Sequence, residues 1–205
     1  MAYYYLAAQL PYLVYGQEPP MSSAAFRELA LSSLENADAA WLPLCVLSPP
    51  GAYAAASGGI GSMDGAAEAA PEFFCRWMEW EKALRLNLAR FRAAKLKRDI
   101  SFDAPDYPAD AAAAAKTAAA MDSPLEAELF LDEARWKAVE VFQGIDYFDR
   151  NTMYAYLLKL LLLERRSRFK AGEGFTEYKG LYAAVMEAAG SGSAAGPKSQ
   201  SGEPK

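Results

Sequence analysis

The segment NTMYAYLLKLLLLERRSRFK, residues 151–170, decides the fold. Apolar residues occupy almost every position from Met153 to Leu163, so a helix built from this segment is apolar on most of its circumference. Such a helix must be buried, and we expect it to be the central helix of a soluble bundle. The candidate N-caps at its start are Asp149, Asn151 and Thr152.

A membrane-spanning helix is the obvious alternative for this segment. Lys159 interrupts the apolar run and Glu164 ends it, which leaves far fewer than the roughly 20 apolar residues that a bilayer requires. The last turn carries a basic cluster of Arg165, Arg166, Arg168 and Lys170. Cations suit the negative end of a helix dipole, and this explanation is preferred to a phosphate site.

The composition limits the possible functions. The 205 residues suffice for one sizeable core or two small lobes, and 53% hydrophobic content excludes disorder for most of the chain. A net charge of −5 argues against nucleic acid as the main partner. Histidine is absent, which removes the commonest general base and metal ligand. We therefore predict no catalytic residue, no cofactor and no metal site.

Two groups of residues keep an enzymatic alternative open. Cys45 and Cys75 are far apart in sequence and form no CxxC pair, so they are expected to be ordinary thiols. Asp146 and Asp149 form an acidic pair, but two acids need a cleft or a perturbing partner to act as general acid and base. A reactive cysteine would revive the enzymatic alternative.

The rest of the chain predicts an all-α fold, a bundle of about six helices with a short extended N-terminal segment. Tyr3 to Leu6 is expected to pack inside as a strand or extended segment, and a helix over residues 3–10 is the alternative left open. The expected helices besides the central one start at Ser22 or Ser23 and run to Leu34, then span Ala39–Leu47, Glu72–Arg98, Ala109–Met121, Ser123–Gln143 and Phe175–Ala188.

Residues 1–189 are predicted to form a single helical domain, with a flexible loop at 48–70 and a disordered tail at 190–205. Gly59, Gly61 and Gly65 lie in that loop, but no strand precedes them and no GK[ST] follows, so a surface loop is preferred to a nucleotide-binding loop.

Apolar periodicity predicts which faces are buried. The helix 72–98 carries a stripe of Phe73, Trp77, Trp80, Leu84, Leu88 and Phe91. The helix that follows Ser123 is expected to bury Leu125, Leu129, Trp136, Val139 and Phe142, and to present a solvated acidic face of Glu126, Glu128, Asp132, Glu133 and Glu140. The alanine-rich helix is expected to lie outside or to bridge two lobes. The last helix is expected to turn Leu181, Tyr182, Val185 and Met186 inward.

Basic residues gather at the ends of two predicted helices. The helix 72–98 ends with RFRAAKLKR, and the central helix ends with ERRSRFK. The simpler explanation of these basic clusters is that they compensate the helix dipole on a solvated face, and the more specific one is that they dock on an acidic partner. The candidate partner-binding residues are Arg92, Lys95, Lys97, Arg98, Arg165, Arg166 and Arg168.

Three stretches together carry a resemblance to a known family. MAYYYLAAQLP (1–11), EWEKALRLNLARFRAAKLKR (79–98) and DYFDRNTMYAYLLKLLLLERRSRF (146–169) resemble an uncharacterised bacterial family encoded among V-type ATP synthase subunits. That family is distantly similar to the C subunit of V/A-type ATPases, the counterpart of the eukaryotic subunit d.

The resemblance implies a non-catalytic subunit of the central stalk that couples the rotor shaft to the membrane ring during ion transport. The implied partners are the central-shaft subunits and the membrane rotor ring. The implied location is cytoplasmic and peripheral to the inner membrane through the ATPase complex, which agrees with the absence of a basic n-region from the first residues. The alternative function is a helical adaptor or scaffold unrelated to ion transport.

Overall fold

The computed structural model describes residues 3–47, 70–98, 104–169 and 178–186, and within these ranges all regular secondary structure is helical. The predicted all-α class is therefore confirmed. The elements are α1 (Tyr4–Gln9), α2 (Ser23–Ser33), α3 (Asn36–Ala39), the 3-10 helix η1 (Leu42–Leu44), α5 (Glu72–Lys95), α6 (Ala109–Ala120), α7 (Pro124–Gln143) and α8 (Arg150–Ser167). Residues 48–69 of the predicted loop at 48–70, and the whole predicted tail at 190–205, lie outside the described residues.

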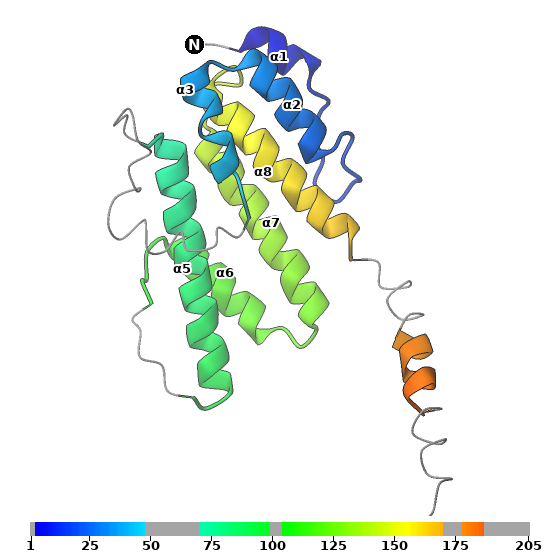
Figure 1. The fold of residues 1–205 in the computed structure, drawn as a ribbon. Helices are drawn as coiled ribbons and strands as arrows, with labels where there is room; N and C mark the ends of the chain where they lie inside the picture. Colours follow the sequence, from blue (N-terminus) through cyan, green and yellow to red (C-terminus); the bar gives the residue numbers. More distant parts are fainter. Residues whose placement is uncertain (1–2, 48–69, 99–103, 170–177, 187–205) are drawn as a thin grey trace, which may run out of the picture. The chain divides into compact units, whose positions relative to one another are not determined.

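The chain divides into two compact units, Met1–Arg166 and Ser167–Lys205. The first unit holds the bundle. In it, α5 and α8 run in the same direction and α7 lies between them in the opposite direction (Figure 1). The carboxyl ends of α5 and α8 therefore lie at the same end of the bundle as the start of α7.

The apolar segment within residues 151–170 forms helix α8, and it is central as predicted. Its first turn is capped by Asp149, whose Oδ1 accepts the backbone N–H of Thr152 at 2.9 Å. Its ring contacts reach two other helices, Phe26 of α2 from Tyr156 and Phe74 of α5 from Tyr154, at centroid distances of 5.0 and 4.7 Å. Its buried residues are Met153, Tyr154, Ala155, Leu157, Leu158, Leu160, Leu162 and Leu163.

Helices α5 and α7 begin and end near the predicted positions. The predicted stripe on α5 is buried from Phe73 to Leu88, and Phe91 packs against the core at its edge. Ser123 Oγ accepts the backbone N–H of Glu126, which caps α7 as expected. Gly144 ends α7 with φ +79°, a conformation that favours glycine.

The alanine-rich helix α6 forms as predicted, but the expectation that it lies outside or bridges two lobes is wrong for one of its faces. Ala111, Ala114, Ala115 and Ala118 are buried, and the helix packs on α5 and α7. Methyl side chains let the backbones approach closely, so this face contributes to the core without bulk. Trp80 Nε1 also donates to Asp110 Oδ2 at 2.7 Å across the α5–α6 contact.

The N-terminal segment is a short helix, α1, so the strand or extended alternative is wrong. Only Tyr3 of the three consecutive tyrosines is buried, together with Leu6. Tyr3 donates its hydroxyl to Asp38 Oδ2 at 2.5 Å and its backbone N–H to the carbonyl of Phe148 at 2.5 Å. These tertiary bonds fix the segment against α3 and the α7–α8 loop.

The predicted helix over Ala39–Leu47 is also wrong. The chain forms α3 one turn earlier and then η1, which contains Pro43. Proline has no N–H to continue an α-helix. Arg27 of α2 satisfies the carbonyls of this segment, with Nη1 and Nη2 donating to Leu42 and Cys45 at 2.9 and 3.0 Å.

In the second unit, residues 178–186 are helical, within the predicted Phe175–Ala188. The expectation that Leu181, Tyr182, Val185 and Met186 turn inward is wrong, because all four are exposed. In the part of the chain that the structure describes, none of the helices has the length and apolarity needed to cross a bilayer.

Candidate functional site

The charged residues of the bundle form a network that crosses α5, α7 and α8. Arg135 of α7 makes a two-pronged contact with Glu81 of α5, from Nε to Oε2 at 3.0 Å and from Nη2 to Oε1 at 3.2 Å. Its Nη1 also donates to Asp132 Oδ1 at 3.2 Å. Asp132 in turn accepts from Arg165 of α8, whose Nε lies 3.1 Å from Oδ2. Three helices are therefore joined by ion pairs inside the core.

The network extends at both ends with alternating sign. Arg85 Nε lies 2.6 Å from Glu81 Oε1, and its Nη2 donates to the carbonyl of Leu47 at 2.9 Å. At the other end, Glu128 lies 3.3 Å from Arg165 Nη2 and 3.6 Å from Arg92 Nη2. The order is therefore Arg85, Glu81, Arg135, Asp132, Arg165, Glu128 and Arg92.

The centre of the network is fully enclosed, with exposed fractions of 1% for Glu81, 0% for Asp132 and 4% for Arg135. Burial raises the pKa of Asp132, and the guanidinium groups of Arg165 and Arg135 oppose this shift. Burial acts to lower the pKa of Arg135, but the carboxylates of Glu81, Asp132 and Glu128 together outweigh it, and the pKa is raised. Buried charges persist only where such partners surround them.

This network corrects one prediction and adds residues that the sequence-based prediction missed. Asp132 is predicted on a solvated face, but it is buried because two arginines pair with it. Glu81 and Arg135 are absent from the candidates that the sequence supplies. Both lie in phase with apolar residues: Glu81 falls four residues after Trp77 and Arg135 four residues before Val139. A charge in phase with an apolar stripe is the signal that could have found them.

The two basic helix ends predicted from the sequence meet at one end of the first unit. A single carboxylate, Glu128, contacts Arg92 near the end of α5 and Arg165 near the end of α8. Beyond Arg92 the side chains of Lys95, Lys97 and Arg98 are exposed. We call Arg92, Lys95, Lys97 and Arg98 the basic end of the bundle.

The arginines of α8 have internal contacts that the sequence did not reveal. Arg165 belongs to the network. Arg166 lies over the ring of Tyr15 at 5.0 Å, and its Nη1 donates to the Tyr15 hydroxyl at 3.2 Å. Arg168 belongs to the second unit, where it is exposed.

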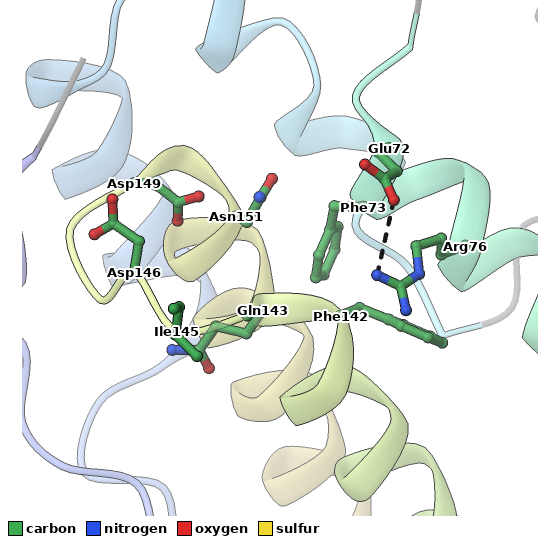
Figure 2. Close-up of a pocket in the computed structure, with 10 residues that line it drawn as sticks. Glu72, Phe73, Arg76, Phe142, Gln143, Ile145, Asp146, Asp149 and Asn151 are labelled. Carbon is green, nitrogen blue, oxygen red and sulfur yellow. Dashed lines mark ion pairs between the residues drawn. The ribbon is translucent and has the colours of Figure 1, made fainter.

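The acidic pair of the enzymatic alternative lines a cleft of about 240 Å³ at the opposite end of the first unit. Figure 2 shows Asp146 and Asp149 on the α7–α8 loop, across from Glu72 and Arg76 of α5. One carboxylate oxygen of each aspartate already accepts a hydrogen bond from a backbone N–H. Asp146 Oδ1 accepts the N–H of Phe148 at 2.9 Å, and Asp149 Oδ1 caps α8. These hydrogen bonds account for both aspartates as residues that stabilise the loop and the start of α8, without a role in proton transfer.

The thiols are of two kinds. Cys45 is buried, and burial raises the pKa of its thiol, which disfavours the nucleophilic thiolate. Cys75 is exposed on α5, and its Sγ lies 3.9 Å from the carbonyl of Ala70. Among the side chains that the structure places, no three cysteine or carboxylate groups gather in a way that could hold a metal ion.

Comparisons of the chain with protein-family models, with curated proteins and with solved structures each return no match.

Proposed function

We propose that this chain is a non-catalytic subunit of a V/A-type rotary ATPase, similar to the C subunit, that docks through its basic end on an acidic surface of the central stalk. The observation that carries the proposal is the convergence of the two basic helix ends at Glu128. The family resemblance of residues 1–11, 79–98 and 146–169 supplies the identity of the complex.

The arrangement of charges supports an interaction role for the basic end. The chain as a whole has a net charge of −5, yet Lys95, Lys97 and Arg98 are all exposed at or just beyond the end of α5. Exposed charges of one sign at the rim of an interface speed association and favour partners of opposite charge. An acidic protein surface fits this end better than nucleic acid, which the overall negative charge repels.

The internal contacts narrow the set of docking residues. Arg165 holds Asp132 in the core and Arg166 holds Tyr15, so charge reversal at either position would disturb the bundle itself. Lys97 and Arg98 lie beyond the end of α5, where reversal leaves the network untouched. These two residues therefore give the cleaner test.

The experiment is affinity purification of the tagged, full-length chain from its native host, with mass spectrometry of the intact complex. The unmodified chain is expected to bring down catalytic and shaft subunits of a V/A-type ATPase in fixed proportion. A Lys97→Glu and Arg98→Glu double variant is expected to lose most of that recovery.

The matched control is a Lys116→Glu and Lys137→Glu double variant, which makes the same charge change at exposed positions on α6 and α7. It should assemble like the unmodified chain. Recovery of the chain alone, from cells whose ATPase is assembled, contradicts the proposal and favours the adaptor alternative. Full assembly of the Lys97→Glu and Arg98→Glu variant contradicts the docking surface.

A further inference from the structure

The end of the bundle opposite the basic end presents apolar side chains to solvent. The α7–α8 loop exposes Ile145, Tyr147 and Phe148 by 96%, 65% and 39%, and α1 exposes Tyr4 and Tyr5 by 62% and 81%. We call these five residues the aromatic end. Isolated exposed apolar residues are ordinary, whereas a contiguous group marks an interaction surface.

Contacts between α1 and the loop make this group contiguous. The rings of Tyr4 and Phe148 lie 4.5 Å apart between centroids. The backbone N–H of Tyr3 donates to the carbonyl of Phe148, and the Tyr3 hydroxyl is held by buried Asp38. The helix and the loop are adjacent in Figure 1 as well. The aromatic end is therefore built from two segments far apart in the sequence, which these contacts hold side by side.

The acid-lined cleft continues this surface. Ile145 belongs to both, and Asp146 and Asp149 of the same loop form one wall of the cleft. The facing wall is Glu72 and Arg76 of α5 with Phe142 of α7 (Figure 2). Three carboxylates and one guanidinium thus line the cleft, which carries an excess of negative charge beside exposed aromatic rings.

Arg76 is an example, within this chain, of a cationic side chain bound at the cleft. Its guanidinium lies 5.1 Å above the ring of Phe142 and 3.8 Å from Glu72. A cation over an aromatic face, next to a carboxylate, is a favourable arrangement for either a guanidinium or an ammonium group. Asp146 and Asp149 each have a second carboxylate oxygen besides the one that serves the backbone, and a carboxylate accepts several hydrogen bonds.

We infer that the aromatic end and the adjoining cleft bind a basic amphipathic segment of a protein partner, with its apolar side chains on the aromatic end and a lysine or arginine in the cleft. Charge complementarity selects this occupant. The carboxylates of Glu72, Asp146 and Asp149 repel anionic lipid headgroups, which separates this surface from a membrane anchor. The inference holds for whichever complex the basic end joins, and it gives the chain two docking ends of opposite charge.

The test is an NMR titration of the 15N-labelled full-length chain at near-physiological salt. The probe is a synthetic amphipathic helical peptide with leucines along one face and lysines along the other, and its counterpart carries glutamate in place of every lysine. The lysine peptide is expected to shift amides at residues 145–149, at Tyr4 and Tyr5, and at residues 72–76. The glutamate peptide should leave these amides unmoved.

Variants assign the binding to the named surface. An Ile145→Ser and Glu72→Gln double variant removes one exposed anchor and one carboxylate, and we expect it to bind the lysine peptide about tenfold more weakly. A Leu31→Ser and Glu79→Gln double variant makes the same kind of change at exposed positions elsewhere, and its affinity should equal that of the unmodified chain.

Three results would overturn the inference. Shifts spread over all acidic surfaces would show general charge attraction, and equal binding of both peptides would show that charge plays no part. Line broadening at the aromatic end by vesicles of phosphatidylcholine and phosphatidylserine, without peptide-induced shifts, would make the surface a membrane contact. None of these results bears on Lys97 and Arg98, so this inference and the proposed function fail separately.

Discussion

Replacing Arg135 by methionine should destabilise the bundle more than any single surface change. Methionine preserves much of the apolar length of arginine and removes the guanidinium that joins Glu81 to Asp132. Both carboxylates would stay buried, with Arg85 left beside Glu81 and Arg165 left beside Asp132.

The magnitude follows from the hydrogen bonds that the substitution removes. Arg135 donates three hydrogen bonds to carboxylates, at 3.0, 3.2 and 3.2 Å, and bonds to charged groups contribute about 1.5–3 kcal/mol each. Their sum is an upper bound, because Arg85 and Arg165 still compensate part of the buried charge. Breaking a buried ion pair by removing one partner costs about 3–5 kcal/mol, and we expect a loss of stability in that range.

The assay is urea unfolding followed by circular dichroism. With a slope of about 2 kcal/mol per molar urea for a bundle of this size, the midpoint should fall by about 2 M. Lys137→Met is the matched control, since Lys137 lies two residues away on α7 and pairs with Glu133 at 2.7 Å on the exposed face. Its midpoint should not move measurably, because exposed pairs contribute little.

A double variant completes the test. If the network acts as a unit, the Glu81→Met and Arg135→Met double variant should lose less stability than the sum of the two single variants. Each single change leaves the charge of the other residue without its partner, whereas the double change removes both charges. Strict additivity would refute the coupling. An Arg135→Met midpoint no lower than that of Lys137→Met would refute a stabilising role for the network altogether.

Two further predictions concern titration and thiol chemistry. Burial raises the pKa of Tyr156 to about 12, and burial together with Asp38 raises the pKa of Tyr3 to about 12, so the folded state keeps protons that the unfolded state releases. The resulting stability is fully present below about pH 10 and is lost as the pH rises towards 12. The urea midpoint should therefore fall across this pH window. A midpoint that does not change with pH, or a pH dependence that Tyr156→Phe leaves unaltered, would contradict the assignment. With a thiol reagent under native conditions, exposed Cys75 should react at once and buried Cys45 only on unfolding, so rapid reaction of both thiols in the folded chain would show that the surroundings of Cys45 open.

The long helices were predictable because local signals and burial agree in them. The continuous apolar run of α8, the aromatic stripe of α5 and the Ser123 cap of α7 each point to the same structure that packing selects. For the N-terminal tyrosines, the local sequence signal and the tertiary contacts favour different structures. Aromatic residues favour strands, but the segment is helical from Tyr4 to Gln9, and hydrogen bonds from Tyr3 to Asp38 and Phe148 anchor its start. Interactions between residues this distant in sequence cannot be read from local pattern.

The candidate sites were less predictable than the fold. The basic residues were visible in the sequence, but their convergence at Glu128 depends on the parallel course of α5 and α8. Asp132 was misassigned because an acidic residue among other acids normally faces water, and only its partners Arg135 and Arg165 reverse that expectation. The aromatic end joins residues 4–5 to residues 145–148, a pairing that no periodicity encodes.

The ionic network also fixes how the helices are aligned lengthwise. If α7 slid along α5 by one turn, about 5.4 Å, the apolar stripes would still face each other, because they repeat with each turn of the helix. Such a slide would carry Arg135 out of reach of Glu81 and Asp132 out of reach of Arg165, and would strand their charges in an apolar layer. The ionic network therefore opposes sliding of α7 along its two neighbours, and it sets the lengthwise register of the three helices.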